Sequence, residues 1–129
     1  MSQAPLGIGV DVVALDRMKD ALDTSGEVFA RKVFTPYERQ QAEKQASPVT
    51  YLAMTFAAKE AIFKTLGIGW GSGVEFSQVE IRQGPHGEPY AVLRGRFAEV
   101  ASERGVARVL LSLSSDDGVA VAVALVSGA

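Results

Sequence analysis

Cysteine is absent from this chain, and histidine occurs once, at His86. Without cysteine there is no disulfide, thiolate zinc site, iron–sulfur cluster or cysteine nucleophile, and the chain suits a reducing compartment. We therefore expect a cytoplasmic protein. His86 lies in the turn sequence Gly84-Pro85-His86-Gly87, where we expect a solvent-exposed side chain with no catalytic role. Serine-hydrolase and zinc-hydrolase chemistry are therefore not expected.

Long apolar runs and an excess of one charge are also missing. No apolar run approaches the roughly 20 residues needed to cross a bilayer, and the N-terminus lacks the basic region of a signal peptide. Thirteen basic and fifteen acidic residues give a net charge of −2, which provides no general attraction for nucleic acid or an anionic membrane. We expect neither as a partner, and any anion site must be local.

The chain is nevertheless long and apolar enough to fold without a covalent cross-link. Its 129 residues, 47% of them hydrophobic, predict one domain over residues 1–129 with its own core. Alternating residues predict a first strand over 6–13, with Asp11 facing away from Val10 and Val12. Hydrophobic runs and turn residues predict further strands over residues 79–81, 90–93, 108–113 and 119–126. The last two are expected to pair as central strands around the turn Ser115-Asp116-Asp117-Gly118.

Capping sequences mark the expected helices. Thr35-Pro36-Tyr37-Glu38 reads as a capping box that opens a helix to about residue 45, and Ser47-Pro48 opens a long helix to residue 66. Shorter segments are expected over residues 15–22, 28–33 and 96–103, with a break at Ser25-Gly26. The sequence thus predicts an α+β fold in which an antiparallel sheet packs on a long central helix.

Glu60 draws attention on that long helix. The predicted apolar stripe contains Leu52, Phe56, Phe63 and Leu66, and helical spacing puts Glu60 on its shoulder. An ion pair with Lys64 four residues on is one explanation, but such a pair contributes only about 0.2–0.5 kcal/mol. A bound cation is the other explanation, because it supplies the missing partner for a poorly solvated carboxylate. Lys59 is expected to extend its ammonium group to water.

Asp11 raises the same question in the first strand. It either caps the following helix or joins Glu60 as a metal ligand. Two hard oxygen ligands without histidine or cysteine suit Mg²⁺, which keeps several waters and is completed by substrate phosphates. Lys64 would then offer a positive charge to those phosphates. Carboxylates, metal and lysine together indicate phosphoryl transfer. The glycine-rich segment 67–73 permits close approach of a ligand, and Trp70 is able to cover an adenine or a protein partner.

Three motifs resemble the holo-(acyl-carrier-protein) synthases, the small stand-alone 4′-phosphopantetheinyl transferases. They are Gly7-Ile8-Gly9-Val10-Asp11, Phe56-Ala57-Ala58-Lys59-Glu60-Ala61-Ile62-Phe63-Lys64 and Leu111-Ser112-Leu113-Ser114. The resemblance implies a homotrimer in lipid metabolism that uses Mg²⁺ and coenzyme A. It implies transfer of phosphopantetheine to a serine of an apo acyl carrier protein, with release of adenosine 3′,5′-bisphosphate.

The resemblance also implies roles for single residues. Asp11 and Glu60 correspond to the metal carboxylates, and Glu60 is also a candidate to activate the carrier's serine through water. Lys64 corresponds to the phosphate-neutralising lysine, and Lys64, Gly67 and Ser115 are expected to contact coenzyme A. Arg17 corresponds to an arginine that meets the carrier's acidic helix.

Two positions depart from the family pattern. Ser115 stands where the family usually has a histidine, and Thr55 stands where it commonly has an arginine. Each loss of a charge-assisted phosphate contact costs roughly 1.5–3 kcal/mol, so a weaker affinity for coenzyme A is expected. A non-catalytic relative that acts as a binding subunit and a small Mg²⁺-dependent nucleotide hydrolase are the alternatives.

Overall fold

The computed structural model describes residues 5–69 and 73–128. Its larger sheet has three antiparallel strands in the order β1-β5-β4, and β2 and β3 form a separate antiparallel pair. The strands are β1 (Pro5–Ala14), β2 (Val79–Gln83), β3 (Pro89–Leu93), β4 (Arg108–Asp116) and β5 (Val119–Ser127). The helices are α1 (Leu15–Val33), α2 (Pro36–Glu43), α3 (Pro48–Thr65) and α4 (Gly95–Glu103), with the short 3₁₀ turn η1 (Phe76–Gln78).

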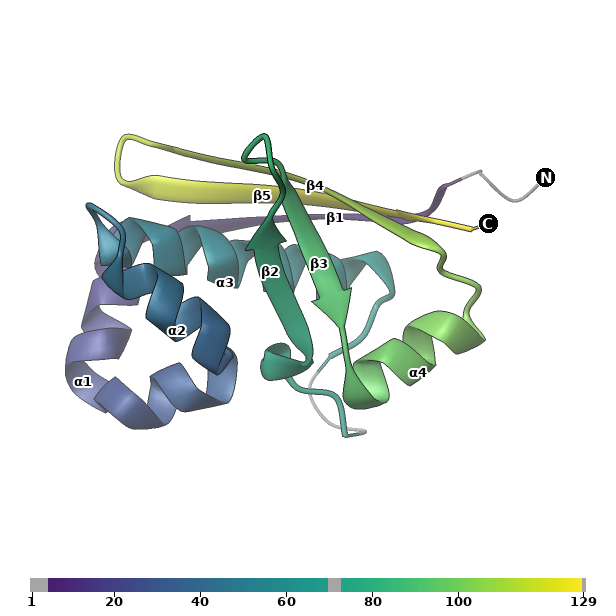
Figure 1. The fold of residues 1–129 in the computed structure, drawn as a ribbon, viewed down its shortest axis with the longest axis horizontal. Helices are drawn as coiled ribbons and strands as arrows, with labels where there is room; N and C mark the ends of the chain where they lie inside the picture. The colour runs from purple at the N-terminus through teal and green to yellow at the C-terminus, as the bar shows by residue number, and fades with distance from the viewer. Residues whose placement is uncertain (1–4, 70–72, 129) are drawn as a thin grey trace.

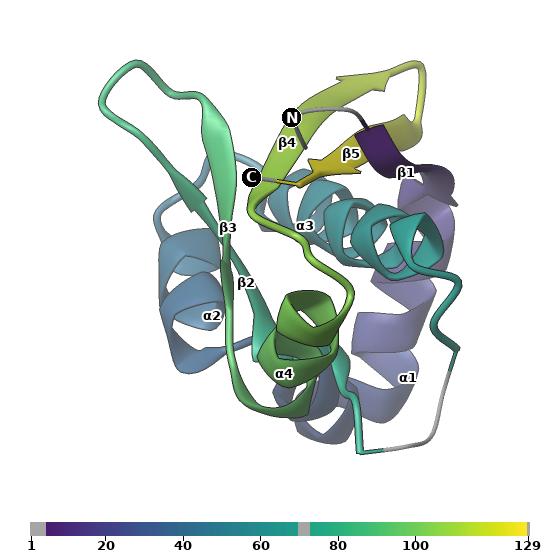
Figure 2. The same cartoon turned by 90° about the vertical axis from the view of Figure 1, so that its right-hand side faces the viewer.

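Helix α3 occupies the middle of the molecule. It runs along one face of the three-stranded sheet (Figure 1). Viewed end-on, the sheet covers one side of α3, the β2–β3 pair and α2 cover another, and α1 lies on the side away from that pair (Figure 2). The expected α+β architecture, with an antiparallel sheet packed on a long central helix, is confirmed.

The predicted helix caps form as the sequence indicates. The Thr35 N–H donates to Glu38 Oε1 at 2.9 Å, and the Glu38 N–H donates back to Thr35 Oγ1 at 3.2 Å. The Thr50 N–H donates to Ser47 Oγ at 3.3 Å at the start of α3. The first helical segment differs from the expectation: residues 15–22 and 28–33 belong to one element, α1, which kinks at Gly26 (φ 48°) instead of ending there.

The last two strands pair as expected, but their positions differ. β5 is central, whereas β4 lies at the sheet edge, so they are not both central strands. Their turn contains only Asp117 and Gly118, at φ 51° and 78°, which is the left-handed backbone that a tight two-residue hairpin requires. Ser115 consequently belongs to β4, where it pairs with Ala120, and not to the turn.

The predicted apolar stripe on α3 is too narrow. The helix is buried on most of its circumference, and small residues pack where other elements approach it most closely. Leu66 follows the helix as its C-cap and is only half-buried. The side chains with no exposed surface in this helix include Ala53, Ala57, Ala58, Ala61 and Ile62. Sequence periodicity missed this arrangement because alanine contributes little apolar contrast between the faces of a helix.

Strand β1 lies directly on the α3 backbone. A Cβ at Gly7 would stand 2.0 Å from the Thr65 carbonyl oxygen, and a Cβ at Gly9 would stand 2.1 Å from the Ala61 carbonyl oxygen. Real atoms cannot approach so closely, so only glycine permits this contact. Because alternate residues of a strand share a face, Asp11 lies on the same face of β1 as Gly7 and Gly9, which is the face toward α3.

Lys59 is buried, and the expectation that it reaches water is wrong. Its side chain has no exposed surface, and Nζ lies 2.8 Å from Glu38 Oε1. The ammonium also donates to the carbonyl oxygens of Phe76, at 3.0 Å, and Val79. Glu38 Oε2 accepts from the Ile81 N–H at 2.6 Å. This ion pair therefore joins α2, α3 and β2 inside the protein.

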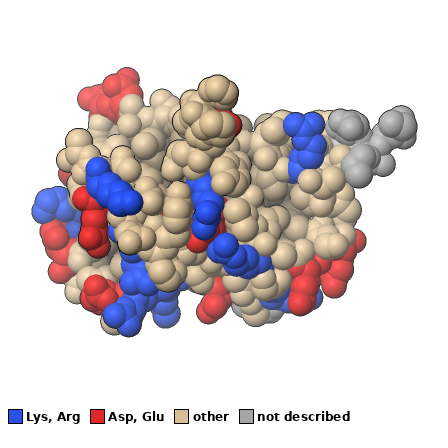
Figure 3. Space-filling model, viewed as in Figure 1, with Lys and Arg blue, Asp and Glu red and all other residues tan. Residues whose placement is uncertain are grey.

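The surface carries charge of both signs. Lysine and arginine side chains are interspersed with aspartate and glutamate on the face shown in Figure 3. None of the helices within the described ranges is long and apolar enough to cross a membrane.

The contact between β1 and α3 predicts a sensitive position. Gly9→Ala places a methyl group against the Ala61 carbonyl, and overpacking of this kind costs about 1–3 kcal/mol. Urea unfolding should show a loss of that size. Gly69→Ala is the control, because a Cβ there meets nothing within 4 Å, and it should change stability by less than about 0.5 kcal/mol. Equal effects of the two substitutions would contradict the close contact.

Candidate active site

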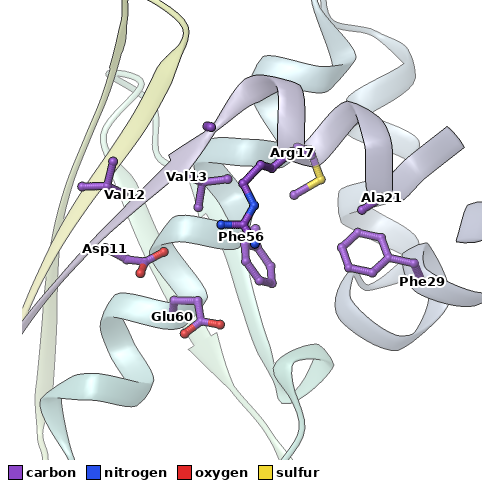
Figure 4. A pocket seen from close by; sticks show the side chains of 10 residues that line it. Asp11, Val12, Val13, Arg17, Ala21, Phe29, Phe56 and Glu60 are labelled. Carbon is purple, nitrogen blue, oxygen red and sulfur yellow. The ribbon is translucent and has the colours of Figure 1, made fainter. Parts of the chain in front are cut away.

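A pocket of about 410 Å³ opens where β1, α1 and α3 meet. Asp11 enters it from β1, Arg17 from α1 and Glu60 from α3. Figure 4 shows the carboxylates of Asp11 and Glu60 near one another, with the Arg17 side chain reaching in from α1. Asp11 and Glu60, which are more than a third of the chain apart, thus meet in one pocket that contains two carboxylates and one guanidinium group.

Asp11 is paired with a lysine. Its Oδ1 lies 3.0 Å from Lys64 Nζ, and only 15% of the Asp11 side chain is exposed. It does not cap α1: the N-cap residue of that helix is Ala14, and no side chain caps it. The Leu15 N–H donates instead to the Gly118 carbonyl oxygen at 2.9 Å. The capping explanation for Asp11 is therefore wrong.

Glu60 has fewer polar partners than Asp11. Within the described ranges it makes no hydrogen bond or ion pair, because Lys64 turns to Asp11. The explanation of Glu60 as one half of a Glu60–Lys64 ion pair is therefore wrong. Burial raises the pKa of Glu60 above its ordinary value of 4.5, and the negative charge of Asp11 raises it further, while Lys64 acts in the opposite direction. The carboxylates are close enough to repel each other.

Arg17 lies at the mouth of this pocket and not on a remote surface. It is exposed on the first turns of α1, and its side chain lines the pocket together with both acids. Further along α1, charges pair within the helix, with Lys19 2.9 Å from Asp23 and Arg31 2.9 Å from Glu27. Arg17 therefore places a positive charge beside both acids of the pocket.

The other expected site residues lie outside this pocket. Gly67 follows the C-terminus of α3, and Ser115 is exposed on β4, two strands away from β1. Thr55 is buried in α3 and donates through Oγ1 to the Tyr51 carbonyl oxygen at 2.8 Å. His86 is exposed in the β2–β3 turn, as expected. Trp70 lies outside the described residues.

The apolar wall of the pocket was not foreseen. Phe56 and Phe29 line it, with ring centroids 6.3 Å apart, and Met18 and Ala21 complete it from α1. The sequence places Phe56 on the apolar stripe of the long helix, and it gives Phe29 no role at a site. The wall is formed by the fold of α1 over α3, which local sequence patterns do not report.

The donor set fits a hard divalent cation that is shared with a substrate. No three His, Cys, Asp or Glu side chains of the described residues gather as a complete metal-binding group. Two carboxylates, one of which makes no ion pair within residues 5–69 and 73–128, would instead supply part of a coordination shell. Mg²⁺ is commonly bound in this way, by one or two carboxylates with waters and phosphate oxygens.

Comparison with known proteins identifies the family. A sequence model of the 4′-phosphopantetheinyl transferase superfamily matches residues 7–124. The chain belongs to this superfamily. It is 44% identical to a holo-[acyl-carrier-protein] synthase of Desulforudis audaxviator over 123 residues, which cover 95% of this chain and 93% of that protein. The expected family and the expected class of enzyme are confirmed, which disfavours the non-catalytic alternative.

Solved structures of the same family share the fold. The holo-[acyl-carrier-protein] synthase of Neisseria meningitidis superposes with a TM-score of 0.89 at 32% identity, covering 95% of this chain and 98% of that one. The Helicobacter pylori enzyme, solved in complex with coenzyme A, gives a TM-score of 0.81 at 27% identity, covering 92% of this chain and 98% of that one.

The raised pKa of Glu60 predicts a stability cost in the metal-free protein. A carboxyl group whose pKa is raised by folding favours the folded state when protonated and disfavours it when ionised. In EDTA, Glu60→Gln should therefore be more stable than the parent at pH 7. The gain should disappear as the pH falls below the ordinary carboxyl value of 4.5, where the parent is protonated as well.

Thermal unfolding across this pH range measures the effect. Glu43→Gln is the matched control because Glu43 is exposed on α2, and it should leave stability unchanged within about 0.5 kcal/mol at both ends of the range. A loss of stability in Glu60→Gln at pH 7, or a gain that persists at pH 3, would show that the ionised Glu60 carboxylate does not destabilise the folded protein.

Proposed function

We propose that this chain transfers 4′-phosphopantetheine from coenzyme A to a serine of an apo acyl carrier protein, with Mg²⁺ held by Asp11 and Glu60. The observation that carries the proposal is the meeting of these two carboxylates in one pocket with Arg17. Family membership supports the reaction class, and the coenzyme A bound to the Helicobacter pylori relative supports the donor.

The residues fit the cation that this reaction needs. Among the described residues Glu60 has no ion-pair partner, and its pKa is raised by burial and by the charge of Asp11, so a cation between the two would relieve both effects. When bound, Mg²⁺ supplies charge neutralisation for a diphosphate. Asp11 and Glu60 are the residues that would hold it.

In the proposed reaction, the carrier provides the nucleophile. The serine oxygen forms a bond to the β-phosphorus of coenzyme A, and the bond from that phosphorus to the bridging oxygen breaks. Adenosine 3′,5′-bisphosphate leaves with the electron pair, and the serine proton passes through water toward Glu60. Lys64 neutralises phosphate charge, Gly67 and Ser115 contact coenzyme A, and Arg17 meets the acidic helix of the carrier.

The apolar wall of Phe29 and Phe56 contributes by excluding water from the acids. A charge in a site with little water acts more strongly on a neighbouring phosphate than the same charge in bulk solvent. Positioning and neutralisation of charge account for most of the acceleration in phosphoryl transfer. We therefore propose that the apolar wall helps to bind the substrate and exclude water, while the polar groups take part in the transfer reaction itself.

Because Thr55 and Ser115 are uncharged, we expect this enzyme to bind coenzyme A weakly. Neither carries the positive charge that the family commonly has at these positions, and each loss should raise the Michaelis constant for coenzyme A by about one or two orders of magnitude relative to a family member with that charge. The same proposal places the enzyme in the cytoplasm and in fatty acid biosynthesis, which the absence of cysteine and the carrier-dependent relatives support.

Intact-mass measurement of the carrier tests the activity. Apo acyl carrier protein incubated with this protein, Mg²⁺ and coenzyme A should gain the mass of one phosphopantetheine group. Asp11→Asn and Glu60→Gln should each reduce the rate by at least about 100-fold, since they remove a ligand of the neutralising cation. Glu43→Gln should leave it unchanged.

The other outcomes identify the alternatives. Consumption of coenzyme A with an unchanged carrier would indicate the hydrolase, and binding of either molecule without chemistry would indicate the binding subunit. Full activity of Glu60→Gln would remove Glu60 from the proposed site.

We also propose that the enzyme is a homotrimer, with the three-stranded sheet as its interface. The sheet face that points away from α3 is apolar and uncovered in one chain. Cross-strand pairs such as Val10 with Val123 and Ile8 with Leu125 lie on it. The exposed apolar residues of this face are Leu6, Ile8, Val10, Val12, Leu110 and Val123. A surface of this kind on a small protein marks an interaction site, and association of identical copies would bring Ser115 toward the pocket of a neighbour.

Two residues of equal exposure test the trimer. Ile8 on β1 and Val28 on α1 are each 68% exposed, so a carboxylate at either position costs the single chain little. Sedimentation velocity should show a trimeric parent, a trimeric Val28→Glu variant and a dissociated Ile8→Glu variant. Ile8→Glu should also lose most transfer activity. A monomeric parent, or a fully active Ile8→Glu monomer, would contradict the shared interface.

A further inference from the structure

Lys64 forms an ion pair with Asp11 in the structure. Its ammonium nitrogen donates to Asp11 Oδ1 at 3.0 Å and to the Val10 carbonyl oxygen at 3.1 Å. Glu60 lies one helical turn before Lys64 and would be its nearest partner along α3. The lysine nevertheless bonds across to β1, which leaves Glu60 without an ion pair to any residue that the structure describes.

Gly9 explains the direction that the lysine takes. A Cβ built on Gly9 would lie 3.0 Å from the Lys64 Cβ, so the beginning of the lysine side chain passes directly over this glycine. The bare backbone of β1 at Gly9 leaves room for the aliphatic chain, which runs along the strand to the Val10 carbonyl and the Asp11 carboxylate. The close packing that brings Asp11 to α3 therefore also aims Lys64 at Asp11.

An ammonium group and a divalent cation would compete for the Asp11 carboxylate. Lys64 Nζ already lies 3.0 Å from Asp11 Oδ1, and a divalent cation bound to the same carboxylate would repel the ammonium at such short range. A cation held by Asp11 and Glu60 would satisfy both acids, whereas the lysine satisfies only one. The side chain of Lys64 is half-exposed, so it is free to move away from Asp11.

We propose that Lys64 is the resident cation of Asp11 in the metal-free protein and that a divalent cation exchanges with it at this carboxylate. The inference rests on the proposed function of Asp11 and Glu60 as metal ligands. Asp11 then has two tasks in turn. It positions Lys64 beside the pocket, and on exchange it releases the ammonium toward the phosphates. The lysine becomes available to the diphosphate only after the cation is in place.

Lysine ammonium signals observed by ¹⁵N NMR test the exchange directly, and the chain provides an internal control. The nitrogens of Lys64 and Lys59 are both held in ion pairs, but Lys59 is buried against Glu38 on the other side of α3. As Mg²⁺ is added to the protein without coenzyme A, the Lys64 signal should shift or vanish. Its midpoint should match the dissociation constant from calorimetry, and the Lys59 signal should stay unchanged.

Lys64→Gln provides a second readout. Calorimetry should show Mg²⁺ binding up to about fivefold more tightly to this variant, because no ion pair has to be broken. In EDTA the variant should be less stable than the parent, and at saturating Mg²⁺ the difference should disappear, since the loaded parent has already lost the pair. Lys44→Gln, at an exposed position, should change neither affinity nor the response to Mg²⁺.

The outcomes separate this inference from the proposed function. If Mg²⁺ binds and the carrier is modified while the Lys64 signal does not move, the exchange is wrong and the metal site stands. If the loaded Lys64→Gln variant is more stable than the loaded parent, the lysine stays near the cation and repels it, which also overturns the exchange. If calorimetry detects no binding of Mg²⁺ that depends on Asp11 and Glu60, the proposed metal site itself falls.

Discussion

The absence of two side chains determines the geometry of this site. Gly7 and Gly9 let β1 rest on the carbonyl groups of α3, at distances that no Cβ would allow. Asp11 is the next residue on the same face of the strand, so the approach that the glycines permit carries its carboxylate to Glu60. Lys64 also reaches Asp11 along the space over Gly9. The acids and the lysine therefore depend on one backbone contact.

On the opposite side of α3, the buried ion pair between Lys59 and Glu38 fixes the helix in place. Lys59 directs all its hydrogen bonds inward, to Glu38 and to the carbonyl oxygens of Phe76 and Val79. A buried ion pair that loses one partner costs about 3–5 kcal/mol, so the helix cannot turn this residue outward without a large penalty. Lys59 and Glu60 are consecutive, and helical geometry separates their directions by about 100°. Holding Lys59 inward thus helps to keep Glu60 at the pocket.

Local patterns in the sequence predicted much of the fold. The capping residues Thr35 and Ser47 gave the starts of α2 and α3, and Asp117-Gly118 lies in the predicted turn of the last hairpin. Helix caps and tight turns depend on residues a few positions apart in the chain, so the spacing of residue types in the sequence predicts them. The kink at Gly26 was predicted as a break, because a glycine shows that the backbone changes direction without showing whether the helix resumes.

Contacts between distant segments were the part that sequence could not supply. Asp11 and Glu60 were paired from their chemistry and from the family resemblance, while their common pocket became visible only in the fold. The partner of Lys59 is 21 positions away in the sequence, counted from Glu38 to Lys59, and nothing in local spacing identifies it. The pairing of Lys64 with Asp11 instead of Glu60 likewise depends on how closely β1 approaches α3.

The proposed function depends above all on one divalent cation that Asp11 and Glu60 hold together. Anomalous diffraction from crystals of the full chain soaked with Mn²⁺ tests it most directly, because Mn²⁺ accepts the oxygen ligands that Mg²⁺ does. Shared binding predicts one strong anomalous peak in the pocket, about 2.1 Å from a carboxylate oxygen of each residue. A peak bound to only one of the two acids, or located elsewhere on the protein, would contradict it.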